Sequence, residues 1–353
     1  MYKYTNLKKK FFRFFSFLLF DCCIFDAEIS MIFHSLSLVI TLLLAVHSWL
    51  RNPEPAGEVS ILFWNLENFF DWIADNGGEE FSSYGNRHWT KRKFEAKCNA
   101  VAKALLWIAD KEGGLPDLVG LAEVENRTVL KKLLENTALK KAGYSIIHYD
   151  SPDPRGIDVA LLFRPSGLTL MDSRPLNIPS LDTRDILLAT FLTARNDSLA
   201  VLVNHHPSKY GKDSGWKREA ALRRLRSATD SLAKEGFRNM VAMGDFNDTP
   251  DNPAFSILTG PGGPGALVGL ALPLWKKGTG SIKYSGKWEL IDLFFVSEIL
   301  VNEGRITPME AIRVPFLSAR DNTHSGEKPL RTYTGPRYSR GVSDHRPVMI
   351  KIR

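Results

Sequence analysis

Short apolar runs alternate with amphipathic segments along most of the chain. Residues 59–64, 157–163 and 199–203 are almost wholly apolar, which is typical of strands buried on both faces. Between such runs, apolar residues recur every three or four positions, as they do after Thr90, a residue suited to cap a helix. This alternation predicts an α/β fold in which helices cover β-sheets. Further strands are expected at residues 117–122, 144–149, 186–192, 239–243, 289–297 and 348–352, helices near 129–134 and over 216–234, and polar loops over 71–89 and 318–341.

Polar side chains follow or interrupt these apolar runs at seven places. Such a residue can face a cleft at the end of a sheet, although Asn is also common in simple turns. Asp158 and Asp292 lie inside apolar runs, where a carboxylate is costly unless it is paired. The seven places are Asn65, Glu123, Asp158, His205, Asp245 with Asn247, Asp292, and Asp344 with His345.

The residue types at these places favour one kind of chemistry. Asp245 and Asn247 would share a face of an extended stretch, and their oxygen atoms suit Mg²⁺ or Mn²⁺. His205 and His206 would point to opposite faces of a strand, so only one is expected in a cleft. The chain has no serine elbow and no glycine-rich phosphate loop. Acids and histidines without a covalent nucleophile indicate metal-assisted attack by water.

Six short motifs, taken in order, resemble those of the endonuclease/exonuclease/phosphatase superfamily, which has the DNase-I-like fold. The resemblance covers residues 59–353 and is strongest to bacterial exported members. It implies one catalytic domain, a four-layer α/β sandwich of two packed mixed β-sheets flanked by helices. The chain departs from the usual pattern at His206, where many relatives have Trp, and at Arg340, where Gly is frequent. The motifs are Trp64-Asn65-Leu66-Glu67-Asn68, Leu121-Ala122-Glu123-Val124-Glu125-Asn126, Arg155-Gly156-Ile157-Asp158-Val159-Ala160, Asn204-His205-His206-Pro207-Ser208, Gly244-Asp245-Phe246-Asn247-Asp248 and Ser343-Asp344-His345-Arg346-Pro347.

The resemblance also implies a role for each candidate residue. Glu123 and Asn65 are expected to hold the catalytic Mg²⁺ or Mn²⁺, with Asp344 nearby. Asp245 and Asn247 are expected to bind or orient the attacking water and the phosphate. Further contacts with the substrate are expected from Asn68, Arg155 and Asn204.

Two carboxylate–histidine pairs complete the expected site. His345 is the expected base on water, with Asp292 holding its ring, since a carboxylate fixes the tautomer of an imidazole. His205 is expected to contact or protonate the phosphoryl oxygens, with Asp158 holding its ring. These pairs would account for both strand acids.

The net charge of the chain indicates what kind of substrate it could bind. The net charge is +7, and the first 58 residues hold six basic and five acidic side chains, so the rest carries +6. A basic body and a basic helix at 216–234 suit an anionic partner, although both are also compatible with ordinary solvated charge. We therefore predict a monomeric nuclease acting on DNA or RNA. The alternative is a phosphatase or phosphodiesterase for small-molecule, inositol or lipid phosphates, and the complete motif set argues against a binding module without activity.

The amino-terminal region has a different composition from the body. Residues 11–20 and 36–46 are apolar runs, each short for a membrane span, and the second has the length of a signal-peptide core. Residues 1–50 are therefore expected to be an export signal or membrane anchor, with Met31 as an alternative start. Residues 51–58 are expected to be a linker, and the protein to be periplasmic or extracellular. Of the three cysteines only Cys98 lies in the body, which excludes a thiolate zinc site there.

Overall fold

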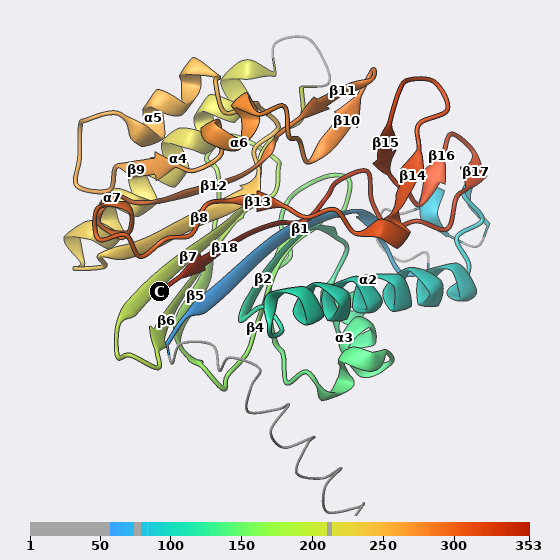
Figure 1. Ribbon diagram of the computed structural model, residues 1–353, viewed down its shortest axis with the longest axis horizontal. Helices are drawn as coiled ribbons and strands as arrows, with labels where there is room; N and C mark the ends of the chain where they lie inside the picture. The colour runs from blue at the N-terminus through green and yellow to red at the C-terminus, as the bar shows by residue number, and fades with distance from the viewer. Residues whose placement is uncertain (1–56, 74–78, 83, 210–213) are drawn as a thin grey trace, which may run out of the picture. The chain divides into compact units, whose positions relative to one another are not determined.

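Two six-stranded mixed sheets lie face to face between layers of helices in the computed structural model (Figure 1). The structure describes residues 57–73, 79–82, 84–209 and 214–353. The signal or anchor expected at 1–50, and residues 51–56 of the expected linker, lie outside the described residues. The predicted four-layer α/β sandwich is confirmed for the body of the chain.

The first sheet is built around the strand that opens the body. Strand β1 runs parallel to β2 and antiparallel to β18, the strand that closes the chain. The first and last strands of the body therefore pair with each other in the interior of one sheet. In spatial order the strands are β13 (Glu310–Ala311), β18 (Val348–Ile352), β1 (Val59–Phe69), β2 (Leu118–Val124), β4 (Asp158–Phe163) and β3 (Ser145–His148).

The second sheet contains one parallel pair, β7 with β8, and is otherwise antiparallel. Because β7 and β8 are parallel, their carboxyl ends meet at one edge, where β7 ends at His205 and β8 at Asp245. In spatial order the strands are β5 (Leu168–Leu176), β6 (Ile186–Thr193), β7 (Ser198–His205), β8 (Asn239–Asp245), β12 (Asp292–Ser297) and β9 (Leu267–Gly269).

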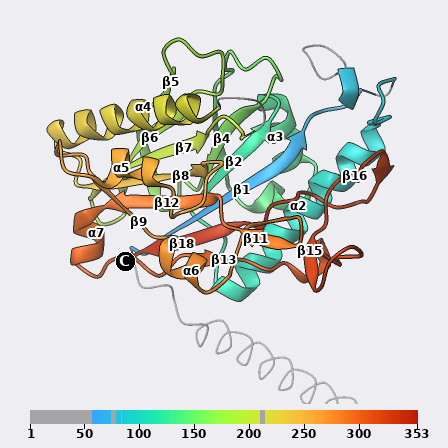
Figure 2. The same cartoon turned by 90° about the horizontal axis from the view of Figure 1, so that it is seen from above.

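Helices cover the outer face of each sheet, as Figure 2 shows from above. Helix α2 begins after Thr90, whose hydroxyl accepts a bond from the backbone N–H of Lys93, so the predicted cap is confirmed. The apolar positions of the helices predicted after Thr90, near residues 129–134 and over 216–234 are buried. The helices are α2 (Lys91–Glu112) and α3 (Arg127–Glu135) against the first sheet, α4 (Gly215–Lys234) and α5 (Ser256–Thr259) against the second, and the short α6 (Leu272–Lys276) and α7 (Glu298–Asn302).

The core follows from alternation along the strands. In β1, Ile61 and Phe63 pack into the core between the sheets, whereas Leu62 and Trp64 pack under α2 and α3. All four are at most 1% exposed, and truncating one such side chain to Ala costs about 2–5 kcal/mol. Gly120 on β2 lets the sheets approach, because a Cβ there would lie 2.6 Å from Met243 Cε of the facing sheet.

Two parts of the fold differ from the sequence prediction. Edge strand β5 was not predicted, since its central residues are exposed and carry no apolar run. The stretch 318–341, predicted as a loop, contains two small hairpins, β14 (Ser318–Arg320) with β15 (Glu327–Pro329) and β16 (Tyr333–Thr334) with β17 (Arg337–Tyr338). A third hairpin joins β10 (Ile282–Tyr284) and β11 (Lys287–Glu289), and single 3-10 turns lie at Glu79–Phe81, Ala138–Lys141, Pro253–Phe255 and Pro315–Leu317.

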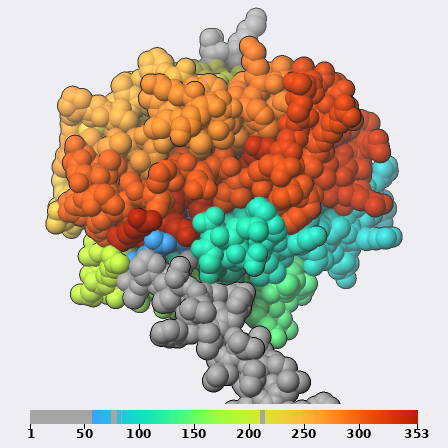
Figure 3. Space-filling view, viewed as in Figure 1, coloured from blue at the N-terminus to red at the C-terminus, as the bar shows by residue number. Residues whose placement is uncertain are grey.

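The later segments of the chain cover much of one face, coloured orange to red above the teal α2 in Figure 3. Residues from Gly57 onward, with the gaps given above, form one compact unit. Within these described residues, no helix has the length and hydropathy needed to cross a membrane.

Candidate active site

Irregular backbone turns two strand ends of the first sheet toward one cleft. The pairing of β2 with β4 shifts register around Glu123, and that of β1 with β2 shifts between Asn65 and Phe69. Glu67, Asn68 and Glu123 all have left-handed backbone, with φ of 48°, 54° and 60°. This conformation is uncommon for residues with a side chain, and bulges of this kind re-aim side chains beside functional sites.

Asp245 is the centre of the acidic group in the second sheet. In the strand register it stands between His205 on β7 and Asp292 on β12. Its Oδ2 atom lies 3.7 Å from Nε2 of His205 and 3.8 Å from Nε2 of His345. Four residues from separate parts of the sequence thus meet at the carboxyl end of β8.

His345 is held from several directions. Its Nδ1 lies 2.7 Å from Oδ2 of Asp292, the pair predicted from the sequence. Its backbone carbonyl accepts a bond from Nε1 of Trp64, and its N–H donates to Ser343 Oγ. The hydroxyl of Ser343 in turn donates to the carbonyl of Asn65 at 2.6 Å, so the segment that carries His345 is hydrogen-bonded to β1. With Nδ1 engaged, Nε2 of His345 is the nitrogen that faces Asp245 and Asp344, each at 3.8 Å.

Asn65 joins the acids of the two sheets. Its Nδ2 donates to Asp245 Oδ2 at 3.0 Å and to Glu123 Oε1 at 3.4 Å, while Oδ1 accepts from the N–H of Glu67. In this orientation the amide presents hydrogens, not an oxygen ligand, to the acidic group. A metal bound through Oδ1 would require the amide to turn over and lose its bond to Glu67.

Burial and charge shift several ionisation equilibria here. Burial raises the pKa of Asp245 to about 7, with Asp292 adding to the effect and His345 opposing it. Burial opposes protonation of His345, but the charges of Asp292, Asp344 and Asp245 outweigh it and raise its pKa well above the usual range. For His205, burial and then the charges of Arg184 and Arg155 lower the pKa well below that range. One histidine therefore favours the charged form and the other the neutral form.

The donor set fits a divalent cation. Asp245, Asp292 and His345 each offer a ligand atom within 4.8 Å of the others, and Oδ1 of Asp292 is buried without a hydrogen-bond partner. Glu123 and Asp344 add oxygen atoms at the more exposed side, with 14% and 22% of their side chains exposed. Carboxylate oxygens are the ligands that Mg²⁺ and Mn²⁺ prefer.

Two arginines flank the acids. Arg155 Nη2 donates to Asn68 Oδ1 at 3.1 Å and lies 3.6 Å from Glu123 Oε2, and Arg331 Nη2 lies 3.2 Å from Asp344 Oδ2. Both arginine side chains are 48% exposed, so each guanidinium reaches solvent beside the cleft. The backbone N–H of Asn68 also donates to Glu123 Oε2 at 2.7 Å, which fixes the position of that carboxylate.

Three sequence-based assignments need correction. Asp158 does not hold His205: its partners are Ser151 and, 3.3 Å away, His148 Nε2, while Nδ1 of His205 has no partner. The reason is placement, because His148 on β3 ends beside the start of β4. Asn204 is 0% exposed and donates to the carbonyls of Leu202 and Met243, so it has no access to a substrate.

The third correction concerns Asn247, which does not continue β8. Its φ of 53° breaks the extended conformation, so the expected sharing of a strand face with Asp245 does not apply. Instead its N–H donates to Asp245 Oδ1 and its Nδ2 to the carbonyl of His206. His206 itself packs on Phe246, away from the acids, as expected for the second of two adjacent histidines.

Three charged residues near the cleft were missed. Glu67 is bound by Arg331, and burial followed by the charge of Asp344 raises its pKa to about 7. Lys97 is 1% exposed and donates to the carbonyl of Glu67 and to Thr332 Oγ1. A lysine on the apolar face of the predicted α2 was a usable signal, whereas nothing in the pattern distinguished Arg331.

Comparison with known proteins identifies the family and supports the fold. The Endonuclease/Exonuclease/phosphatase family matches residues 60–353, whereas no curated protein matches the chain. Truncated Caenorhabditis elegans TDP2 is similar in structure, with 14% identity, a TM-score of 0.54 and coverage of 84% of this chain and 97% of that one. The human nocturnin catalytic domain with bound sulfate anion has 16% identity, a TM-score of 0.53 and coverage of 84% and 95%.

A bacterial structure shows the same degree of likeness. An endonuclease/exonuclease/phosphatase family protein from Bacteroides thetaiotaomicron has 13% identity, a TM-score of 0.52 and coverage of 84% and 97%. At such identities these structures establish the fold alone. The family match over nearly the whole body confirms the resemblance seen in the motifs, and the chain belongs to the endonuclease/exonuclease/phosphatase family of metal-dependent phosphoester hydrolases.

Proposed function

We propose that the protein is a nuclease that hydrolyses phosphodiester bonds of DNA or RNA by attack of an activated water. The observation that carries this proposal is the His345–Asp292 pair, which leaves Nε2 of His345 facing Asp245 and Asp344. A base must lie within reach of the proton that it removes, and its ring must be held in one tautomer. The Asp292 contact would meet the second condition, and Nε2 of His345 would be free to accept a proton once a bound cation offsets the acids that favour the charged ring.

The acids would hold Mg²⁺ or Mn²⁺. In this proposal Glu123 and Asp344 would bind it beside Asp245, and Asn65 would contribute an oxygen only after its amide turns over. Asp292 and His345 would stay paired with each other and would not be ligands. A bound divalent cation would neutralise charge on the phosphate and lower the pKa of water. It would also balance acids that otherwise crowd negative charge around His345.

His205 and the arginines would act on the phosphate. A neutral His205 is suited to donate a hydrogen bond to a phosphoryl oxygen, with its ring 3.7 Å from Asp245. Arg155 and Arg331 are half-exposed on the two sides of the acids, where a guanidinium can bind two phosphate oxygens at once. Asn68 keeps Arg155 oriented toward the cleft.

The preference for nucleic acid rests on what we call the aromatic rim, the partly exposed Phe81 and Tyr338 with Arg87 and Lys93, which pack around the buried Trp89 and Tyr333. Arg87 lies 5.2 Å and Lys93 5.4 Å from the Tyr333 ring centre. Tyr333 follows Thr332, whose N–H donates to Glu67 and whose hydroxyl accepts a bond from Lys97, so the rim adjoins the charged residues beside the site. Half-buried Tyr338 and the charged groups beside it offer a surface for base stacking and backbone contacts.

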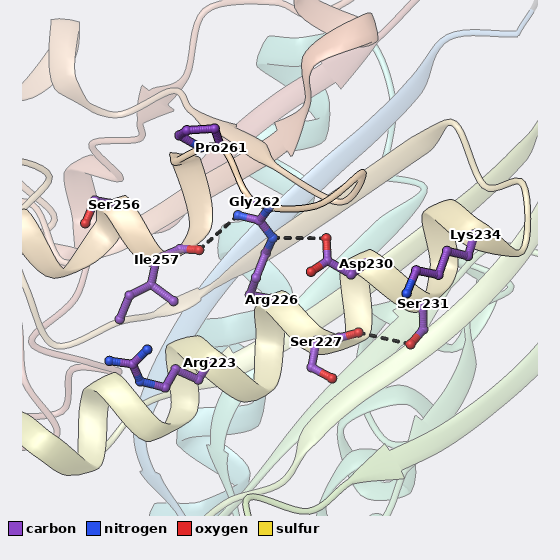
Figure 4. A pocket seen from close by; sticks show the side chains of 10 residues that line it. All are labelled: Arg223, Arg226, Ser227, Asp230, Ser231, Lys234, Ser256, Ile257, Pro261 and Gly262. Carbon is purple, nitrogen blue, oxygen red and sulfur yellow. Dashed lines mark hydrogen bonds and ion pairs between the residues drawn. The ribbon is translucent and has the colours of Figure 1, made fainter.

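The basic helix α4, in contrast, does not support the nuclease assignment. Three of its four arginines contact other parts of the protein: Arg218 contacts Asp248, Arg224 the carbonyl of Asn177, and Arg226 Asp230 and several carbonyls. The fourth, Arg223, is 68% exposed and lies 3.5 Å from Glu219 of the same helix. Figure 4 shows Arg226 held between Asp230 and Ile257 at a pocket of about 480 Å³. Helix α4 therefore does not distinguish the nuclease from the alternative function, a phosphatase or phosphodiesterase for small phosphoesters.

One panel separates the two functions. Purified protein with Mg²⁺ or Mn²⁺ is tested on plasmid, RNA, bis-p-nitrophenyl phosphate and inositol phosphates, with EDTA as the control. The nuclease proposal expects cutting of a nucleic acid, with activity that falls steeply as salt rises. Hydrolysis of the small esters alone would contradict it.

We further propose that the protein is exported, on the strength of the apolar core and flanking charges within residues 1–50. Amino-terminal sequencing of the protein recovered from cell fractions tests this. A processed chain outside the cytoplasm is expected, and an unprocessed cytoplasmic chain would contradict it.

A further inference from the structure

A second group of metal-ligand side chains gathers at the base of the loop that joins β3 to β4. His148 ends β3, Asp150 follows it by two residues, and Asp158 begins β4. One ligand atom from each lies within 4.8 Å of the others. The loop between them carries Arg155 to the active-site cleft.

The histidine of this group is buried with an unused nitrogen. Its side chain is 2% exposed, and Nε2 has no hydrogen-bond partner although Asp158 Oδ2 lies only 3.3 Å away. Asp158 Oδ1 already accepts from both the N–H and the hydroxyl of Ser151. Nε2 of His148 and Oδ2 of Asp158 thus lie close together without forming a hydrogen bond, at a separation that one cation could bridge.

Negative charge at this place has no basic partner apart from the histidine. Among the ion pairs of the described residues, Asp150 and Asp158 pair only with His148. Burial raises the pKa of the neighbouring Asp185, and the charge of Asp158 raises it further. A buried carboxylate is costly unless it is paired with a cation or binds a metal.

We propose that His148, Asp150 and Asp158 form a second divalent-cation site, separate from the active site and selective for ions of the zinc class. An imidazole with two carboxylates is a ligand set suited to Zn²⁺, Co²⁺ or Mn²⁺. Mg²⁺ and Ca²⁺ prefer oxygen ligands alone, so they should bind this site more weakly.

The position of the site gives it a structural consequence. A cation there joins residue 148, at the start of the loop, to residue 158, at its end. Within the loop, Asp153 is fixed by Arg184 at 2.8 Å and accepts a bond from the N–H of Arg155. Closing the base of the loop would therefore stabilise the segment that presents Arg155 to the cleft.

The test measures bound Zn²⁺ on the full-length, metal-stripped protein by equilibrium dialysis and elemental analysis. Wild type is compared with His148→Gln and Asp150→Asn, each also in a Glu123→Gln background that disables the active-site ligands. The amount of bound Zn²⁺ is compared between variants and not taken as an absolute value, because Cys22 and Cys23 can also bind zinc. We expect each substitution to remove one equivalent, or to weaken one site by at least about tenfold, in both backgrounds.

The matched control is Asp172→Asn, which removes an exposed carboxylate on β5 whose one ion pair among the described residues is with Arg174. It should keep the wild-type stoichiometry and the wild-type rise in Tm on adding Zn²⁺, a rise that His148→Gln should lose. If His148→Gln does not fold, Asp150→Asn decides, because that side chain is 88% exposed. Equal Zn²⁺ binding in wild type and Asp150→Asn would overturn the proposal, whatever the protein hydrolyses.

Discussion

Nδ1 of His345 lies 2.7 Å from Oδ2 of Asp292, and the two side chains are 6% and 0% exposed. Both come from segments more than fifty residues apart, brought together where β12 begins beside the closing strand. The pair fixes the ring so that Nε2 faces the acids. This relationship is the basis of the first prediction.

His345→Ala should lower kcat on a phosphodiester by about 10²–10⁴-fold, the range for loss of a general base. Asp292→Asn should lower it less, because the base remains but its tautomer is no longer fixed. His324→Ala, which removes a histidine beside Asp321 with 45% of its side chain exposed, is the control and should not change kcat. A wild-type rate in His345→Ala would show that another group removes the proton.

The aromatic rim predicts a substrate-dependent effect. Tyr338→Ala should lower kcat/KM on single-stranded nucleic acid by about five- to a hundredfold, since stacking on one aromatic ring contributes about 1–3 kcal/mol per base. The same variant should hydrolyse bis-p-nitrophenyl phosphate at the wild-type rate. Equal losses on both substrates would assign Tyr338 to folding instead of binding.

The buried pair of Arg184 and Asp153 predicts a stability effect. The two side chains are 7% and 4% exposed and meet at 2.8 Å. Arg184→Met should lower the free energy of unfolding by about 3–5 kcal/mol, because it leaves a buried carboxylate uncompensated. Adding Asp153→Asn should recover part of that loss, as measured by urea denaturation. A single variant as stable as wild type would mean that water reaches Asp153.

Lys97 predicts a stability that depends on pH. Burial lowers its pKa from 10.5 to about 8, against the opposing charges of Glu67, Glu123 and Asp344. Above pH 8 the folded state loses this proton while the unfolded state keeps it up to about pH 10.5. The unfolded state then binds more protons, so this residue makes stability rise with pH across that window, by up to about 3 kcal/mol.

The measurement compares the free energies of unfolding of wild type and Lys97→Met at pH 8 and pH 10. The advantage of wild type over the variant should grow between these two values. A difference that stays constant or shrinks would mean that Lys97 keeps an ordinary pKa in the folded protein.

The positions of the main strands and helices along the chain were accessible from the sequence, because apolar runs and helical spacing report burial directly. Thr90 marked the start of α2, and the apolar run at 348–352 marked β18. Edge strand β5 carried no such signal, since neighbouring strands and not its own side chains decide its conformation. The sequence did not indicate the hairpins within 318–341 either, because their short polar strands carry no apolar run.

Parts of the candidate site depend on tertiary geometry that no local pattern records. Asp158 could have served either of two histidines, and only the position of β3 assigns it to His148. The left-handed backbone at Glu67, Asn68 and Glu123 follows from bulges that the packed sheets impose. The pairing of His345 with Asp292 was predictable because the family resemblance implied a carboxylate–histidine pair and Asp292 was an otherwise unexplained acid inside an apolar run.

The most direct test of the account is the metal dependence of phosphodiester hydrolysis in wild type and Glu123→Gln. Rates on bis-p-nitrophenyl phosphate and on the cleaved nucleic acid are measured with EDTA and then over a series of Mg²⁺ and Mn²⁺ concentrations. We predict that EDTA abolishes wild-type activity, that either metal restores it, and that Glu123→Gln needs at least about tenfold more metal for half-maximal rate. Undiminished hydrolysis by the wild-type protein in EDTA would contradict a metal-dependent site.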